Sequence, residues 1–384
     1  MMHERSKTGT VYIPVRRAGE PGFRVFRDPV DVVRADTVAD VGGSLNRIAA
    51  GVRRGLQAAG WIAYEAAPAM DAALTTQPVC PLPLVWFGLY RRPEYVSGVE
   101  LERQQNSFCV GTWTPSISKP RYLNDISRIR QALAAGETYQ VNHTMRLRTS
   151  FRGDAAALFL ALYRAQPAAS AMYIDAGEFA LASVSPELFV RRHGNCLTSR
   201  PMKGTVSRTG NAGADTARAR RLAVSVKDRA ENVMIVDMIR NDMGRIAEYG
   251  SVRTRHLFAV ETYPTVLQMT STVTARTTAE WPEVIRAMFP CASITGAPKV
   301  RTMALIRGLE TTPRGVYTGC MGYLSGPTSY RFNVAIRTVT IDRRRNRAEY
   351  GIGGGIVWDS QGDREYRECL LKAAVLHDLA GGSE

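Results

Sequence analysis

Residues 332–357, FNVAIRTVTIDRRRNRAEYGIGGGIV, decide the fold class of this chain. Two runs rich in β-branched and aromatic residues, Phe332 to Ile341 and Ala348 to Val357, predict long strands. The polar cluster Arg343 to Arg347 between them predicts the tip of a hairpin. A further strand is predicted before them, at Val316 to Leu324. Such antiparallel strands, mixed with helices, favour an α+β sandwich over a doubly wound parallel sheet.

Helical and strand-like segments alternate irregularly over the rest of the chain. Apolar residues at helical spacing predict helices at 41–59, 121–135, 155–166, 216–246, 279–288 and 363–379, and one opened by Gly296-Ala297-Pro298 in its first turn. Apolar or extended runs predict strands at 61–65, 139–147, 178–190, 195–200 and 265–274. The run 216–246 has the clearest helical periodicity.

The length of 384 residues allows two domains or one large unit with a sizeable core. The formal charge of +15 is compatible with a nucleic-acid partner or with anionic substrates. Because the arginines are spread from end to end, we expect them to support solubility or the steering of small acidic molecules. No nucleic-acid partner is expected.

The cysteines and the apolar segments indicate the compartment. Six cysteines lie far apart, with no CxxC pair and no histidine at zinc-ligand spacing, so we expect reduced thiols. The N-terminus has no apolar core of a signal peptide. The longest uncharged run, Ala72 to Tyr90, contains three prolines, which excludes a membrane helix there. We expect a cytoplasmic protein without a membrane partner.

Only six of the 50 basic residues are lysines, and one of them, Lys203, lies in the stretch SRPMKGTV at 199–206. A guanidinium keeps its proton, whereas an enclosed ammonium can become a nucleophile or a base. Lys203 is therefore a candidate nucleophile. The alternative is a solvated lysine in a loop.

The last predicted helix carries Glu365, Glu368 and Lys372 at positions i, i+3 and i+7, on one face. Two carboxylates so placed suit Mg²⁺, which leaves much of its coordination to water and substrate oxygens. An ordinary surface pair between Glu368 and Lys372 accounts for the same spacing.

Three further features have both a structural and a functional interpretation. The glycines within 351–355 let backbone amides approach an anion, but glycine-rich strand ends are also common without a ligand. Glu231 borders the apolar face of its helix, where a carboxylate must be paired or bind a metal. Glu187 opens a strand and is either solvated or a general acid with a raised pKa.

Together these segments resemble the chorismate-utilising enzymes, the group of anthranilate synthase component I, aminodeoxychorismate synthase component I, isochorismate synthase and salicylate synthase. The motifs follow one another as YQVN (139–142), SPELF (185–189), RPMKGT (200–205), DRAENVMIVDMIRNDMGR (228–245), SITGAPKVR (293–301), FNVAIRT (332–338) and GIGGGIVWDS…REYRECLLK (351–372). The stretch WIAYEAAPAMD (61–71) extends the resemblance to most of the chain.

The resemblance implies an α+β fold of the anthranilate synthase component I type, with two packed, mainly antiparallel sheets flanked by helices in a single large domain. Residues 1–100 are then the N-terminal component I region of this sandwich, and residues 101–384 the chorismate-binding catalytic region. The implied Mg²⁺ carboxylates are Glu231, Glu365 and Glu368. The implied substrate-binding residues are Gln140, Thr295, Arg337, Gly353, Gly354, Gly355 and Lys372.

Two positions indicate the branch of the group. Gln140 stands where isochorismate and salicylate synthases carry a lysine that deprotonates water, and glutamine cannot act as that base. Lys203 lies in a PIKGT-like motif of the aminodeoxychorismate synthases, where anthranilate synthases usually place alanine. The resemblance implies that the Lys203 amine attacks ring carbon 2 of chorismate while the 4-hydroxyl leaves, with Glu187 as proton donor. Ammonia then adds at carbon 4 and expels the lysine, which gives 4-amino-4-deoxychorismate.

One position departs from the group. A histidine is common in the strand around 263–270, where this chain has Leu267-Gln268. A role of that histidine in pyruvate elimination is not available here, which argues against anthranilate or salicylate formation. Altered or weakened activity is the other consequence.

The partners and alternatives follow from what the chain lacks. No cysteine lies in a glutaminase-type elbow, so we expect ammonia from a separate glutamine amidotransferase subunit. The product is expected to serve 4-aminobenzoate and folate synthesis or a specialised metabolite, through another protein. Anthranilate synthase component I is the alternative activity, and an inactive relative that binds nucleic acid is a more remote one.

Overall fold

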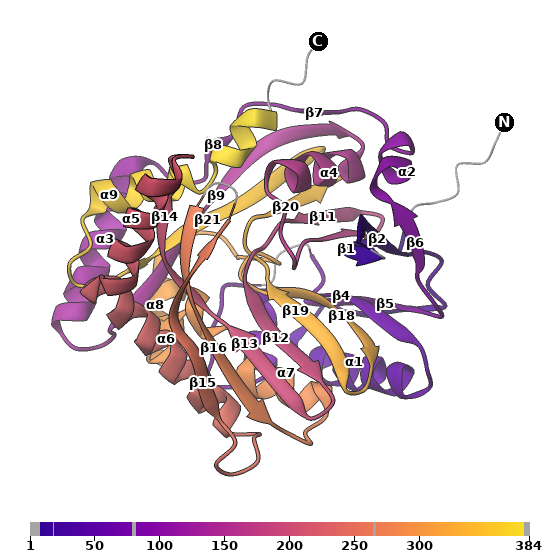
Figure 1. Ribbon diagram of the computed structural model, residues 1–384, viewed down its shortest axis with the longest axis horizontal. Helices are drawn as coiled ribbons and strands as arrows, with labels where there is room; N and C mark the ends of the chain where they lie inside the picture. Colours follow the sequence, from indigo (N-terminus) through magenta and orange to yellow (C-terminus); the bar gives the residue numbers. More distant parts are fainter. Residues whose placement is uncertain (1–7, 18, 79–81, 264–265, 380–384) are drawn as a thin grey trace.

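The computed structural model describes residues 8–17, 19–78, 82–263 and 266–379. Two sheets, both antiparallel, pack face to face, and helices cover their outer faces (Figure 1). Within the described residues the first sheet has 11 strands and the second has 10. The α+β sandwich predicted from the sequence is confirmed.

The first sheet runs in the order β17, β9, β21, β20, β11, β10, β1, β2, β6, with β7 and β8 also paired to β9. Its strands are β1 (Thr10–Arg17), β2 (Glu20–Phe26), β6 (Glu94–Ser97), β7 (Phe108–Val110), β8 (Thr114–Pro115), β9 (Gln140–Gly153), β10 (Met172–Asp175), β11 (Phe179–Ser183), β17 (Gly296–Ala297), β20 (Thr338–Asp342) and β21 (Arg347–Ile356). The arginine cluster at 343–347 lies at the tip of the β20–β21 hairpin, as predicted.

The second sheet runs in the order β14, β16, β13, β12, β19, β18, β4, β5, β3, with β15 paired to β16. Its strands are β3 (Asp31–Ala35), β4 (Gln57–Ile62), β5 (Val85–Tyr90), β12 (Leu188–His193), β13 (Cys196–Arg200), β14 (Met202–Ser207), β15 (Arg253–Thr262), β16 (Val266–Arg276), β18 (Cys320–Gly326) and β19 (Ser329–Val334). Strands from the first hundred residues lie in both sheets.

Helices cover the two outer faces. The second sheet is covered by α1 (Val38–Arg53), α6 (Val226–Gly244) and α7 (Trp281–Met288), and the first by α3 (Lys119–Ala134), α4 (Ala155–Ala165) and α9 (Gly362–Leu371). The other helices are α2 (Gly98–Arg103), α5 (Ala212–Val224), α8 (Lys299–Leu309), η1 (Tyr64–Ala69), η2 (Ala292–Ile294) and η3 (Ala374–Leu379).

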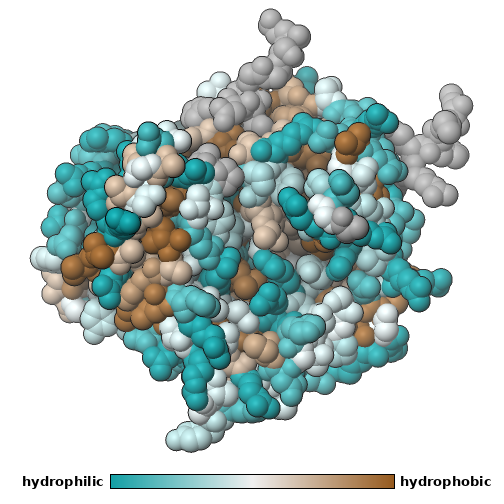
Figure 2. Space-filling model, viewed as in Figure 1, coloured by the Kyte–Doolittle hydropathy of each residue, from teal (hydrophilic) through white to brown (hydrophobic). Residues whose placement is uncertain are grey.

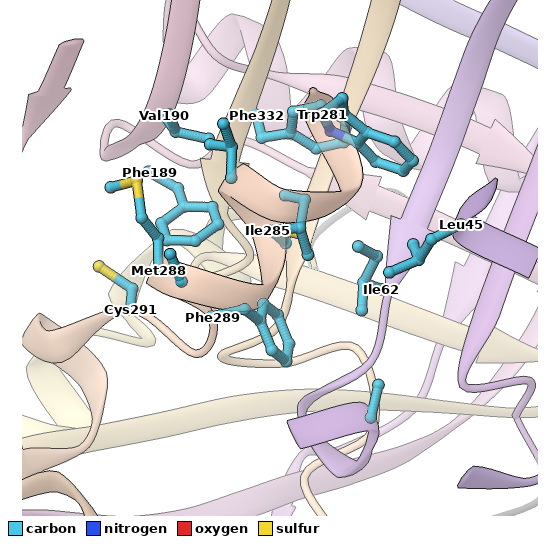
Figure 3. Packing of buried hydrophobic residues seen from close by; sticks show 14 of the residues in the cluster. Leu45, Ile62, Phe189, Val190, Trp281, Ile285, Met288, Phe289, Cys291 and Phe332 are labelled. Carbon is cyan, nitrogen blue, oxygen red and sulfur yellow. The ribbon is translucent and has the colours of Figure 1, made fainter. Parts of the chain in front are cut away.

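The apolar core has separate parts in these layers. Under α7, Trp281 stacks on Phe332 with ring centroids 5.7 Å apart, and Figure 3 shows Ile285 and Met288 of the same helix turned toward the sheet. Between the sheets, Trp61 and Trp86 stack at 5.1 Å within a smaller apolar cluster. Each such aromatic pair contributes about 0.5–1.5 kcal/mol beyond its burial of area. The candidate site lies beside this cluster, where the interlayer is polar.

The predictions of single strands at 178–190 and 332–341 are wrong in one respect. Each of these segments forms two strands, one in each sheet. The chain leaves β11 in the first sheet and enters β12 in the second, and it passes from β19 back to β20. The two crossovers lie side by side: the Val184 amide donates to the Arg337 carbonyl at 3.0 Å and the Val334 amide to the Glu187 carbonyl at 3.1 Å. Strand propensity carries no signal for a change of sheet, so the sequence pattern could not show it.

The helix predicted at 216–246 is also two helices. Ser225 has extended backbone angles (φ −62°, ψ 115°) and its side chain accepts a hydrogen bond from the Asp228 amide at 3.3 Å, so it is the N-cap of α6. The apolar periodicity continues across the break, which explains the error.

Four smaller predictions need correction. The helix predicted at 41–59 ends at Arg53, and the strand predicted at 61–65 occupies 57–62, followed by η1. The strand predicted from Val316 begins at Cys320. Pro298 is the N-cap of α8 instead of a first-turn residue. The five described cysteines are free thiols, and Cys80 and Thr265 lie outside the described residues.

The described helices include none long and apolar enough to cross a bilayer. The face of the molecule drawn in Figure 2 is mainly hydrophilic, with apolar side chains in small groups.

A buried carboxylate fastens the loop that precedes β18 to η1. The Glu65 side chain is 1% exposed and accepts hydrogen bonds from the amides of Arg314 (2.7 Å) and Gly315 (2.8 Å). Burial raises the pKa of Glu65 to about 7. Loss of the Glu65 carboxylate would leave the amides of Arg314 and Gly315 without this acceptor.

We expect Glu65→Gln to lower the free energy of unfolding by about 1–3 kcal/mol, because a donor then faces a buried amide donor. Urea unfolding measures this change. Glu20→Gln, at an exposed position on β2, is the matched control and should change stability little. Equal losses in the two variants would contradict the role given to Glu65.

Candidate active site

A cavity of about 250 Å³ opens between β21 of the first sheet and β14 of the second, with α6 and α9 at its sides. All but two of the site residues predicted from the sequence line it. They are Glu187, Lys203, Glu231, Arg337, Gly353, Gly354, Gly355, Glu365, Glu368 and Lys372. The residues come from segments nearly 190 positions apart in the chain, and the sandwich brings them together.

Lys203 lies on β14 and not in a loop, which corrects the alternative interpretation. Its side chain is half-buried and crosses to the first sheet, where a Cβ built on Gly355 would lie 3.1 Å from the Lys203 Nζ. Burial lowers the pKa of Lys203, while the charges of Glu231 and Glu187 act in the opposite direction. The net lowering increases the fraction of free amine, the form that can attack an electrophile.

The backbone around Lys203 is irregular. The pairing of β14 with β16 shifts register between Met202 and Thr205, and Gly204 has a φ of +86°. A Cβ on Gly204 would lie 2.9 Å from the Asp228 carboxylate. A bulge with glycine at this place directs the neighbouring side chain out of the regular strand pattern.

Glu187 lies at the crossover from β11 to β12 and is 3% exposed. Burial raises its pKa to about 7, against the hydrogen bond from Ser293, the charge of Lys203 and the Met202 amide. Its Oε1 has no hydrogen-bond partner among the described residues. A carboxyl group that is partly protonated near neutral pH and has a free oxygen can donate or accept a proton.

Three carboxylates face the same cavity from two helices. Burial raises the pKa of Glu231 on α6 and of Glu365 on α9, and Glu231 and Glu365 repel each other. Burial also tends to raise the pKa of Glu368, but the charges of Lys372 and Lys227 outweigh this effect, so the pKa is lowered. Lys227 lies 4.0 Å from the Glu231 carboxylate, a weak pair within the helix.

The donor set fits a hard divalent cation. Among the described residues no three carboxylate, imidazole or thiol side chains already converge as a closed metal cluster. Mg²⁺ needs only one or two protein carboxylates, and water or substrate oxygens complete its octahedron. A cation held by these carboxylates would offset both the burial and the carboxylate repulsion that raise the pKa values of Glu231 and Glu365.

Two cations also line the cavity, and one of them contacts a carboxylate named above. Lys372 donates from Nζ to the Gly353 carbonyl at 2.8 Å and pairs with Glu368 at 2.9 Å, so the ordinary i, i+4 pair also exists. Arg337 donates to the Lys372 carbonyl at 2.7 Å, is hydrogen-bonded to Tyr350, and lines the cavity. Both groups suit an anionic ligand.

Two predicted residues do not line the cavity. Thr295 is fully buried and donates its hydroxyl hydrogen to the Cys291 or Ala292 carbonyl, at 3.3 and 3.2 Å. Gln140 is fully buried, and its amide lies on the same side of Gly355 as the Lys203 Nζ, since a Cβ built on Gly355 would lie 3.1 Å from each nitrogen. Neither of its amide atoms has a hydrogen-bond partner among the described residues. Gln140 therefore lies next to the end of Lys203 without lining the cavity, and Thr295 lies within the packed loop.

Gln268 on β16 is a cavity residue that the sequence interpretation treated only as a departure. It donates from Nε2 to the Gly204 carbonyl at 2.9 Å and accepts from the Thr205 hydroxyl at 2.7 Å. These bonds hold the bulge that carries Lys203. The pairing of β14 with β16 is not visible in the sequence, so nothing there linked Gln268 to Lys203.

We expect Gln268→Met to reduce about tenfold the rate of a reaction in which Lys203 is the nucleophile, since one hydrogen bond is worth ~1 kcal/mol and Lys203 loses its fixed position. Steady-state kinetics measure kcat and KM. Thr205→Val removes one of the two bonds and should have a smaller effect. A normal kcat in Gln268→Met would show that the bulge needs no side-chain support.

Comparison with known proteins gives one family. The model of the chorismate binding enzymes matches residues 24–378. Among curated proteins, the chain is 46% identical to an aminodeoxychorismate synthase of Streptomyces griseus over 66% of this chain and 35% of that protein. It is 42% identical to aminodeoxychorismate synthase component 1 of Klebsiella aerogenes, over 70% of this chain and 59% of that protein.

Solved structures show the same fold. Anthranilate synthase component I from Streptococcus pneumoniae TIGR4 superimposes with a TM-score of 0.80 at 22% identity, over 94% of this chain and 93% of that one. The fold is therefore of the anthranilate synthase component I type. The chain spans between about a third and three fifths of the length of the two curated relatives above (35% and 59%).

Proposed function

Since the chain belongs to the family of chorismate-binding enzymes, we propose that it aminates chorismate with ammonia to 4-amino-4-deoxychorismate. Lys203 is the observation that carries this proposal. An amine with a lowered pKa faces the glycine side of β21, beside a buried carboxyl group and opposite three carboxylates. This combination suits covalent catalysis on a small dianion.

The first step forms a bond from the Lys203 Nζ to ring carbon 2 and breaks the carbon–oxygen bond at carbon 4. Glu187 gives its proton to the departing hydroxyl, which leaves as water, and then takes a proton from the bonded lysine nitrogen. In the second step ammonia bonds to carbon 4 and the bond from carbon 2 to Lys203 breaks. Glu187 returns a proton to the lysine nitrogen and receives one from the new ammonium group, so the residues end as they began.

The remaining residues bind and orient the substrate. Arg337, Lys372 and the amides of Gly353 to Gly355 would bind its carboxylates. Glu231, Glu365 and Glu368 would hold Mg²⁺, which supplies positive charge to a substrate carboxylate. Gln140 would act beside Lys203, and Thr295 would act by holding the loop in place. Residues 1–100 would form part of the sandwich and 101–384 the catalytic region.

The source of ammonia is a separate glutamine amidotransferase subunit. The name component 1, carried by the relatives from Klebsiella aerogenes and Escherichia coli, supports a second component. The product would enter 4-aminobenzoate and folate synthesis or a specialised pathway, in the cytoplasm.

The test is chorismate turnover with Mg²⁺ and ammonium at mildly alkaline pH, with chromatographic separation of the products. We expect 4-amino-4-deoxychorismate, and a loss of turnover when EDTA removes the metal. Accumulation of anthranilate would point to the alternative activity. No turnover, together with salt-sensitive binding of nucleic acid, would support an inactive relative.

A further inference from the structure

A second cavity, of about 350 Å³, lies over the same face of the first sheet as the candidate active site. Its floor is formed by β20 and β21, and the loop 312–315 and Leu82 cover it. Three arginines at its rim, Arg148, Arg345 and Arg347, are exposed, so it opens to solvent. The proposed reaction steps use none of these residues.

A thin partition separates the two cavities. Tyr317 and Gly351 line both of them. The Tyr317 ring lies against the Gly351 backbone so closely that a Cβ on Gly351 would lie 2.1 Å from the ring. The Arg146 guanidinium lies over the Tyr317 ring, 5.0 Å from its centroid, in a cation–π contact.

Arg314 is the other side chain that forms the partition. It lines the second cavity and donates hydrogen bonds to the carbonyls of Asn142 (2.7 Å) and Ile294 (2.8 Å), two residues that line the first. One aromatic side chain and one ion-paired arginine therefore separate the second cavity from the catalytic one.

One face of β21 borders both cavities. On the catalytic side of the partition this face consists of glycines only. Residues 347, 349 and 351 line the second cavity, and Gly351, Gly353 and Gly355 continue along the same face into the first. Four residues of strand span about 13 Å. This row of glycines, from Gly351 to Gly355, ends beside the Lys203 Nζ.

We propose that this second cavity is the entrance for ammonia, with the Tyr317 ring as the gate, an inference that rests on the function proposed above. Chorismate and its cation would fill the open side of the catalytic cavity before ammonia is needed at carbon 4. The second cavity offers an independent approach along the glycine face. Three of the arginines in its walls, Arg148, Arg314 and Arg345, are paired with carboxylates, and Arg347 adds a positive charge that favours passage of uncharged ammonia over ammonium.

The test is to fill the second cavity at a distance from the catalytic groups. Thr340 on β20 lines it and is half-buried, so Thr340→Trp occupies the passage and Thr340→Val is the matched control of equal size. Thr312→Trp fills the same space from the opposite wall and serves if the first variant does not fold. Thermal unfolding establishes which variants are folded.

Initial rates are measured against ammonium concentration at saturating chorismate and Mg²⁺. We expect kcat/KM for ammonia to fall at least about tenfold in the tryptophan variants, ~1.4 kcal/mol of added barrier, with the KM for chorismate unchanged. Thr340→Val should behave as the wild type. A folded tryptophan variant with normal kcat/KM for ammonia, or with an equal loss of kcat/KM for chorismate, would overturn the proposal. Failure of the function itself is recognised separately, because the wild type would then form no 4-amino-4-deoxychorismate.

Discussion

Replacement of Lys203 by alanine is expected to lower kcat for chorismate amination by at least about a thousandfold, because a covalent step then has no nucleophile. The two other lysines that line the cavity do not place an amine at the position of the Lys203 Nζ. Its Nζ lies against Gly355, and the other lysine contacts to this cavity, from Lys227 and Lys372, are made by side chains paired with Glu231 and Glu368.

Lys203→Arg separates charge from nucleophilicity. A guanidinium preserves the positive charge near Glu187 and Glu231 but has no free lone pair at any working pH. We expect Lys203→Arg to be as inactive as Lys203→Ala while chorismate still binds, as equilibrium dialysis would measure. Full activity in either variant would exclude the covalent route. Anthranilate formation by Lys203→Ala would favour the alternative synthase.

Glu187→Gln is expected to lower kcat by about a hundredfold to ten-thousandfold, the usual range for loss of a general acid or base. The glutamine has nearly the same size and can still accept from Ser293 and the Met202 amide, so the fold should be retained. Mass spectrometry of the quenched enzyme gives a second readout. Lys203 would remain able to react slowly with chorismate, so an adduct in Glu187→Gln would place the defect in proton transfer.

The pH dependence gives a sharper test of the same residue. Burial holds the pKa of Glu187 at about 7, above its ordinary value of 4.5, with Lys203, Cys291 and Ser293 as the facing groups. The protonated form, which donates to the leaving hydroxyl, is therefore lost as pH rises through about 7. We expect kcat of the wild type to fall on this limb, and Glu187→Gln to lack it. An identical limb in both enzymes would assign the titration to another group.

The same shift affects stability. In the folded protein Glu187 keeps its proton up to about pH 7, whereas in the unfolded chain it ionises near 4.5. The unfolded state therefore binds fewer protons between these values, and the free energy of unfolding contributed by Glu187 falls as pH rises through this window. Glu65 has a similar pKa and adds a second contribution of the same sign.

Much of the site could be predicted because its chemistry depends on residue type. Lys203 stands out among arginines, the glycines of β21 leave a backbone face open, and Glu365 and Glu368 share a helical face by spacing alone. The hairpin at 343–347 and the α+β class follow from strand propensity and turn residues. Such features are local, so one segment contains all the information needed to predict them.

Only the tertiary structure decided which of these residues meet. The crossovers at Glu187 and Arg337 change sheet through paired backbone hydrogen bonds between segments some 150 residues apart, and no local propensity encodes a choice of sheet. Gln268 supports Lys203 only because β16 pairs with β14. The pKa of Glu187 depends on the desolvation produced by everything packed around it. Residue types set the available chemistry, and burial between the two sheets sets the protonation and position through which that chemistry acts.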